Sequence, residues 1–256
     1  MLNSYKKGIV MIKDFIDGFT GYFRHLGLIS KYGLWWYVLI PGLLSILMGG
    51  LIFMAAWQMA DGIGAMLIHY YPFEWGHEAV EKSVNFIGGI GIGAMGFMLF
   101  KYLIMIIASP FMSFLSERIE NRMYGKKAVA SFSITATISG LIRGVRLAFR
   151  NIIRELSFTF VLFLVGLIPI FSLVSAALII VVQAYYAGFG NMDFTMERRF
   201  RLKESVRFVR RNRGFAVGNG LAFVLLLMTG CGFLIALPLG VIGATVGTLD
   251  RIEPRV

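Results

Sequence analysis

Two stripes of basic side chains are the groups in this chain best suited to hold an anion. The first lies between residues 139 and 155 and consists of Arg143, Arg146, Arg150 and Arg154. The second lies between residues 198 and 213 and consists of Arg199, Lys203, Arg207 and Arg210. Their spacing predicts that each stripe follows one face of a helix. Two interpretations stay open: the stripes anchor the chain at cytoplasmic lipid headgroups, or they concentrate anions at the mouth of a pore.

A mixed group of acids and bases lies in the amphipathic segment 111–124. It comprises Glu117, Arg118, Glu120 and Arg122. Charges this close to apolar sequence belong just outside the lipid or in a water-filled vestibule. A purely structural salt-bridge cluster is the alternative.

No group of residues indicates catalysis or a bound metal. Cys231 is the single cysteine and lies in an apolar tract, which predicts a small buried side chain. His69 and His77 lie among acids, but their spacing matches no metal-ligand pattern, so a solvated loop is favoured. The glycines in 91–96 match G-x-G-x-x-G without the strand and the acid that a dinucleotide site needs. We therefore expect a protein that is not an enzyme and that has no cofactor and no metal.

The composition places the chain in a membrane. Hydrophobic residues make up 57% of its 256 residues and charged residues only 15%, and the mean hydropathy of +0.75 lies far outside the range of soluble domains. The net charge of +11 does not indicate nucleic acid, because the lysines and arginines lie beside apolar tracts. We expect one all-α membrane domain that covers residues 1–256.

Three segments of the first half predict an interfacial helix and two transmembrane helices. Residues 1–31 place apolar side chains at helical spacing, with charges around the rest of the wheel, as an amphipathic helix in the membrane interface does. Segments 33–60 and 83–109 are each long enough to span, since one crossing needs about 20 residues. The second contains Lys101, which can snorkel if it lies near an interface. Ser109-Pro110 is expected to break this helix.

Two longer tracts, 156–192 and 214–249, contain 37 and 36 residues without a charge. Each is too long for one span and too short for two spans with a turn. Their breakers are Gly166 and Pro169 in the first tract and Gly230, Gly232 and Pro238 in the second. We predict two helical hairpins, re-entrant or crossing as two short helices. In the first, the arms have about 13 and 20 residues, so the first arm is too short to span unaided.

The charge of the connecting segments predicts the topology. Basic and acidic residues number 5 and 2 in 1–31, 8 and 3 in 117–155, and 8 and 3 in 193–213, which makes these segments cytoplasmic. Segment 61–82 has 1 base and 4 acids and is expected outside. Because 117–155 and 193–213 lie on one side, the tract between them crosses the membrane an even number of times. Interrupted apolar segments of this kind also point toward transport sites.

Several short motifs occur in the order and spacing of one membrane family. They are Gly33-Leu34 with Tyr37-Val38-Leu39-Ile40-Pro41; Ala108-Ser109-Pro110-Phe111 with Leu115, Glu117, Glu120 and Arg122; Arg154-Glu155; Ile168-Pro169; and Pro238 with Gly243-Ala244-Thr245. From about residue 18 to residue 251, the chain resembles the CysZ sulfate permeases and, more broadly, the etoposide-induced-protein-like membrane family. The resemblance implies an interfacial first helix, two long transmembrane helices, half-penetrating hairpins, a bacterial inner membrane and a homo-oligomer.

The resemblance also implies where substrate binds. The sulfate-contacting motif of the family is a Gly-Leu followed by two arginines; here Gly33 and Leu34 match it, but Trp35 and Trp36 replace the arginines. Indole offers one neutral donor where sulfate needs positive charge. Backbone amides near Gly33, with Lys31 and Arg24, are the expected substitutes. By the same resemblance, Glu117, Glu120 and Arg122 line a central polar passage and gate or tune conduction.

The expected function is an inner-membrane anion permease that passes sulfate or a related oxyanion without hydrolysing ATP. Its expected partners are the oxyanion, membrane lipids and further copies of the chain, and no nucleic acid. The alternative is a membrane scaffold of the same fold that does not transport but acts on lipid or partner proteins, with the tryptophan pair as an interface anchor.

Overall fold

The computed structural model describes residues 2–69, 100–124, 134–166, 168–229 and 232–253, and within these ranges the chain is helical without a strand. The helices are α1 (Leu2–Arg24), α2 (Gly27–Tyr32), α3 (Trp36–His69), an unlabelled helix (Phe100–Ile107), α5 (Ser109–Tyr124), α6 (Ile134–Gly166), α7 (Ser172–Met196), α8 (Leu202–Arg211), α9 (Arg213–Met228) and α10 (Phe233–Ile252). A short 3₁₀ turn, η1, covers Pro169–Phe171. The expectation of an all-α protein is confirmed for this part of the chain.

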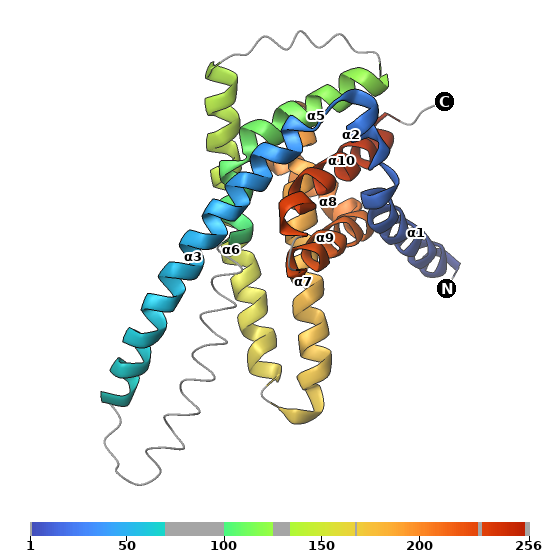
Figure 1. Cartoon of the computed structure of the whole chain (residues 1–256). Helices are drawn as coiled ribbons and strands as arrows, with labels where there is room; N and C mark the ends of the chain where they lie inside the picture. Colours follow the sequence, from blue (N-terminus) through green and yellow to red (C-terminus); the bar gives the residue numbers. More distant parts are fainter. Residues whose placement is uncertain (1, 70–99, 125–133, 167, 230–231, 254–256) are drawn as a thin grey trace.

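The core of the bundle is formed by α7, α9 and α10, with α1 packed on α9 and α10 and with α3 and α5 packed on α10 (Figure 1). The hairpin arms of α6 and α7 and the far end of α3 extend beyond this core, whereas α2 and α5 lie at the opposite end of the molecule (Figure 1). The molecule therefore has one compact end and one end where long apolar helices protrude.

The centre is held together by close backbone contacts along α9. A side chain on Gly220 would overlap the carbonyl oxygen of Ala184 in α7, and one on Gly188 would overlap that of Ala216 in α9. On its other side, α9 presents Gly218 to α1 in the same way. Small residues let membrane helices approach until their backbones touch, and packing replaces the weak hydrophobic drive between helices in lipid.

In the part of the chain that the structure describes, three helices are long and apolar enough to cross a membrane, or four if the bent pair Phe100–Ile107 and Ser109–Met123 counts as one span. The three are Trp36–Ala55 in α3, Ser172–Met196 in α7 and Leu234–Ile252 in α10. Only 22% of the α3 window and 33% of the α7 window are buried in this chain, against 72% for α10. Most of the surface of the first two windows is therefore not covered by the described chain, whereas α10 is an internal helix.

The first half of the chain departs from expectation in three places. The predicted helix in 1–31 is two helices, because the chain turns at residues 25–26 between α1 and α2. The predicted span 33–60 begins later and is longer: α3 starts at Trp36 and continues to His69, so the first residues of the predicted loop 61–82 are helical. Of the predicted span 83–109, only residues from Phe100 onward are described. The rest of that span, with its glycines, and His77 and Cys231 lie outside the described residues.

The predicted break at Ser109-Pro110 is confirmed. The helix Phe100–Ile107 and α5 meet at an angle of 63°. Pro110 fits this place because the first turn of a helix does not use its N–H groups for internal bonds. The bend turns α5 across the end of the bundle, where its polar face meets the end of α7.

Each of the two predicted hairpin tracts contains two helices in the described residues, and their path through the membrane stays a prediction. In the first tract, α6 ends at Gly166, and η1 and α7 follow from Pro169 onward, at the breakers named from the sequence. Its first arm is not a separate short helix of 13 residues, however, because α6 is continuous for 33 residues from the basic segment into the apolar tract. In the second tract, α9 ends at Met228 and α10 begins at Phe233, and Pro238 lies inside α10 rather than between the two helices.

Filling the contact between α7 and α9 should destabilise the protein. Gly220→Ala places a methyl group against the backbone of Ala184, and overpacking of this kind costs about 1–3 kcal/mol. Thermal unfolding in detergent should show a lower midpoint for Gly220→Ala. The matched control is Gly50→Ala in α3, where a Cβ meets nothing within 4 Å, and its midpoint should be unchanged or higher. Equal midpoints for the two variants would contradict the close contact.

The charge-based topology is testable with a membrane-impermeant maleimide. In a Cys231→Ala background, single cysteines introduced by Arg118→Cys and Lys203→Cys replace exposed residues on either side of the first hairpin. Both should be labelled from the same face of sealed vesicles, because the tract between them crosses an even number of times. Labelling from opposite faces would exclude the hairpin.

Candidate functional site

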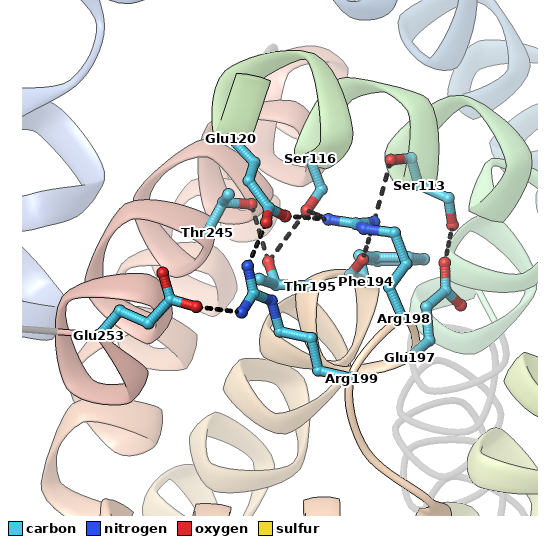
Figure 2. A network of polar contacts seen from close by, with 10 residues as sticks. All are labelled: Ser113, Ser116, Glu120, Phe194, Thr195, Glu197, Arg198, Arg199, Thr245 and Glu253. Carbon is cyan, nitrogen blue, oxygen red and sulfur yellow. Dashed lines mark hydrogen bonds and ion pairs between the residues drawn. The ribbon is translucent and has the colours of Figure 1, made fainter. Parts of the chain in front are cut away.

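A polar network joins α5, the end of α7, the turn between α7 and α8, and α10 (Figure 2). Its centre is Glu120 of α5, which is 8% exposed. Arg198 donates to one carboxylate oxygen of Glu120 at 3.2 Å, and Arg199 donates to the other. Arg199 also pairs with Glu253 at 2.8 Å. Two guanidinium groups and two carboxylates thus balance each other at the compact end of the bundle.

The side chains of this network are positioned by helix geometry. On α5, Ser113, Ser116 and Glu120 lie three and four residues apart and so share one face. Below them, the hydroxyl of Thr195 lies 3.0 Å from those of Ser116 and Thr245, which connects α7 to α5 and α10. All three hydroxyl residues are buried. Because buried polar groups are costly without partners, this chain of hydrogen bonds fixes how the three helices meet.

Arg198 is the most accessible cation of the network. Its guanidinium donates to the carbonyl oxygen of Phe194 at 2.8 Å and to Ser116 Oγ at 2.9 Å, besides Glu120. The Arg198 side chain keeps 27% of its surface exposed. It is therefore held in one orientation while part of it still faces solvent, a combination that suits transient contact with an anion.

Arg143 joins α6 to the same region. It donates to both carboxylate oxygens of Asp193, at 2.8 and 3.2 Å, and to Ser205 Oγ at 2.8 Å. A further bond of 2.5 Å goes to the carbonyl oxygen of Phe200. Within the basic stripe of α6, Arg143 is thus a paired, half-buried residue, and it fixes the start of α6 against α7 and α8.

A cavity of about 430 Å³ lies where α5 bends away, and we name it the bend cavity. Its polar lining consists of Ser109, Ser113, Glu117, Ser139, Arg143, Glu197 and Arg198. A smaller cavity of about 40 Å³ adjoins it and shares Ser109 and Glu197. Ser109 Oγ is buried and has no hydrogen-bond partner among the described residues. A water needs at least about 10–15 Å³, so both cavities have room for one at this hydroxyl.

Glu197 is the titratable group of the bend cavity. It lies just after the last residue of α7, and Ser113 Oγ donates a hydrogen bond to it. Burial raises the pKa of Glu197 to about 7, against the opposing effect of that hydrogen bond. Near neutral pH, the carboxyl is therefore present in both its protonated and its ionised form, which gives the cavity a variable charge.

The structure does not place Lys101 at an interface. Its side chain is 1% exposed, and Nζ lies 2.5 Å from a carboxylate oxygen of Glu155 in α6, so snorkelling is excluded. The hydroxyl of Tyr102 donates to the other oxygen of Glu155 at 2.5 Å. Removing one partner of a buried ion pair typically costs about 3–5 kcal/mol, because the remaining charge is left unpaired. This contact ties the helix Phe100–Ile107 to α6 deep inside the bundle.

Of the predicted substrate residues, Gly33 and Leu34 lie at the turn between α2 and α3, Lys31 lies in the last turn of α2, and Arg24 ends α1. Gly33 has a positive φ of 65° and ends α2; its N–H donates to the carbonyl oxygen of Ser30 at 3.3 Å. The N–H of Leu34 donates to Ile29 at 2.8 Å. The amides at Gly33 and Leu34 are thus already used, a consequence of the helix-ending turn that glycine permits. Lys31 and Arg24 are exposed, the former 5.5 Å from the ring centre of Tyr32.

The predicted pore residues fall in different places. Glu120 is at the centre of the network, Glu117 lines the bend cavity, and Arg122 is exposed. The sequence-based search missed Arg198, Glu197 and Ser113. Glu197 and Arg198 could have been singled out from the segment between Asp193 and Arg199, because charged residues first reappear there after 37 uncharged residues. Among the described residues, no group of three or more His, Cys, Asp or Glu could hold a metal ion.

The apolar helices define the class: this is a multi-pass helical membrane protein with a polar network and a cavity at one end. Comparison with known sequences then gives the family. The sequence model described as sulfate transporter CysZ/etoposide-induced protein 2.4 matches residues 22–238, and the chain belongs to this family. The resemblance read from the motifs is thereby confirmed.

Two curated relatives, both from Pseudomonas fluorescens, carry the name sulfate transporter CysZ. The protein of strain Pf0-1 is 23% identical over 230 residues, which cover 86% of this chain and 88% of the relative. That of strain Pf-5 is 26% identical over 151 residues, which cover 59% of this chain and 61% of the relative's length. The matches establish a membrane transport family at low identity.

Proposed function

We propose that this chain is an inner-membrane permease that passes sulfate or a related oxyanion without hydrolysing ATP, and that the bend cavity lies on the path. One observation carries the second part. Two guanidinium groups, Arg143 and Arg198, and the hydroxyls of Ser113 and Ser139 line a cavity of about 430 Å³ inside a membrane bundle. Guanidinium forks and hydroxyls are the groups that replace the water shell of an oxyanion.

The acids beside these arginines suit passage rather than storage of an anion. Asp193 and Glu120 already accept bonds from Arg143 and Arg198, and Glu197 adds a charge that is lost on protonation. An arriving oxyanion therefore competes with carboxylates for the guanidinium groups, and its binding stays weak. Conduction requires this balance, because a site must attract an ion and also release it.

We further propose a first contact at the turn between α2 and α3. Lys31, in the last turn of α2, supplies exposed positive charge there, and Arg24 at the end of α1 is exposed as well. The helix α3 begins with Trp36, two residues after Leu34. The turn lies at the same end of the molecule as α5 (Figure 1). In this account, Glu120 holds the network closed around Arg198 and Arg199, Glu117 tunes the charge of the bend cavity, and Arg122 acts at its exposed rim.

The membrane arrangement is part of the proposal. The N-terminus and the basic segments lie in the cytoplasm, α1 lies in the interface, and the hairpins enter the membrane from the cytoplasmic side. The exposed faces of α3 and α7 are covered by lipid and by other copies of the chain in a homo-oligomer. Re-entrant backbone needs such cover, because lipid satisfies no hydrogen bonds.

Uptake of radiolabelled sulfate into proteoliposomes tests this function. Wild-type vesicles should accumulate sulfate above empty vesicles, and Arg198→Gln should lower the initial rate by about tenfold or more, since a hydrogen bond to a charged group contributes about 1.5–3 kcal/mol. Arg118→Gln, which removes an exposed arginine of α5 outside the bend cavity, should keep the wild-type rate. A wild-type rate equal to that of empty vesicles would exclude a permease and favour the non-transporting scaffold.

Sulfate uptake should also depend on pH through Glu197. Its pKa of about 7 means that the carboxyl is mostly neutral at pH 6 and mostly ionised at pH 8, so the bend cavity repels an anion more strongly at the higher pH. With the same pH on both sides of the vesicle, the KM for sulfate should rise from pH 6 to pH 8. Glu197→Gln should keep a low KM at both values; an unchanged pH dependence in this variant would contradict the role of Glu197.

A further inference from the structure

A second hollow lies along α7 and shares no lining residue with the bend cavity. It is a groove of about 1000 Å³ between α1, the arms of α6 and α7, and the start of α9, and we name it the arm groove. Ile12 of α1, Phe158 of α6 and Val181 of α7 are among its apolar walls. These three side chains are 60%, 55% and 45% exposed, so the groove opens outward along the protruding hairpin.

Positive charge gathers at one end of the arm groove. Arg210 and Arg213 line it directly, and both are exposed. With Arg150 and Arg154 of α6, they lie close enough to Tyr185 to interact electrostatically with its hydroxyl. Arg150 also interacts with Arg154 and Arg210, which carry the same charge. The two basic stripes of the sequence therefore converge here from different helices.

This positive charge is not compensated within the part of the chain that the structure describes. The salt bridges there engage Lys101, Arg143, Arg198, Arg199 and Arg251, and none involves the four arginines at the groove. The acids near the bundle are used elsewhere: Asp14 pairs with Arg251 at 2.6 Å, and Glu155 pairs with Lys101. Like charges held together without a counter-ion favour an anionic ligand.

The position of the charge selects the kind of anion. Arg154 lies two residues before Leu156, where the uncharged tract of α6 begins, so the arginines lie close to the start of the apolar arm. A free oxyanion gains nothing from the apolar walls, whereas a phospholipid carries a phosphate and acyl chains on one molecule. We propose that the arm groove binds an anionic phospholipid, with its phosphate between Arg210 and Arg213 and an acyl chain along Ile12, Phe158 and Val181. Guanidinium pairs hold phosphate oxygens in this manner, and apolar contact holds the chain.

Native mass spectrometry of the full chain in detergent tests the proposal, with phosphatidylglycerol and phosphatidylcholine added in equal amounts. The wild-type protein should retain phosphatidylglycerol in preference to phosphatidylcholine. Arg210→Gln with Arg213→Gln should lower that retention by about tenfold or more, because two charged hydrogen-bond donors are lost. The matched control, Arg118→Gln with Arg122→Gln, removes two exposed arginines of α5 and should bind as the wild type does.

A second variant separates the groove from its charge. Val181→Trp keeps every arginine but fills the apolar wall, and it should also lose the lipid; circular dichroism confirms that each variant is folded. Equal retention in the wild type and the Arg210/Arg213 variant, or equal loss in the control pair, would overturn the proposal. So would displacement of the lipid by millimolar glycerol phosphate, which would identify a site for a free phosphate. None of these outcomes depends on whether the chain transports sulfate.

Discussion

The close contact of α9 with α1 on one side and α7 on the other is the constraint on which the other features depend. Gly218, Gly188 and Gly220 allow backbones to touch where any side chain would overlap a carbonyl group. This contact fixes α7, and α7 in turn delivers Asp193, Glu197 and Arg198 to the end of the bundle. The polar network and the bend cavity therefore depend on residues that have no polar side chain at all.

A bundle with so few charges uses them in pairs. Lys101 and Glu155 are paired deep inside, Arg143 holds Asp193, and Arg198 and Arg199 share Glu120. An unpaired charge in such surroundings is costly, whereas a pair is tolerated and orders the helices around it. The arginines at the arm groove differ because no acid of the described chain pairs with them. The paired arginines therefore hold helices together, whereas the arginines at the arm groove are the ones that we propose bind an anionic ligand.

Much of the architecture follows from apolar lengths and breakers. In the tract 156–192, 37 uncharged residues with Gly166 and Pro169 in the middle fit neither one span nor two, and they predicted two helices with a break between them. Ser109-Pro110 predicted the bend before α5. The prediction that Pro238 breaks the helix was wrong, because it lies inside α10. A proline is tolerated inside a membrane helix when the backbone carbonyl groups that it leaves without a hydrogen bond find other partners. The sequence could not show that α6 runs unbroken through its basic segment, since charge marks a membrane boundary but does not end a helix.

The site was only partly predictable for a different reason. Glu117 and Glu120 were recognisable as charges in an amphipathic segment. The partners of Glu120, however, are Arg198 and Arg199, which are 78 and 79 residues away in sequence, and only helix packing brings them together. The same holds for Lys101, whose partner Glu155 is 54 residues away. Residues near Gly33 were singled out through family resemblance, and the local backbone explains why their amides serve the turn.

The central claim is that an oxyanion occupies the bend cavity between Arg143 and Arg198. The most direct test is a crystal structure of the full chain with selenate, whose selenium can be located by anomalous scattering. The account predicts an anomalous peak within hydrogen-bonding distance of the Arg198 guanidinium in the wild-type protein, and its loss in Arg198→Gln. A peak at the turn between α2 and α3 alone, or one that persists unchanged in the variant, would contradict it.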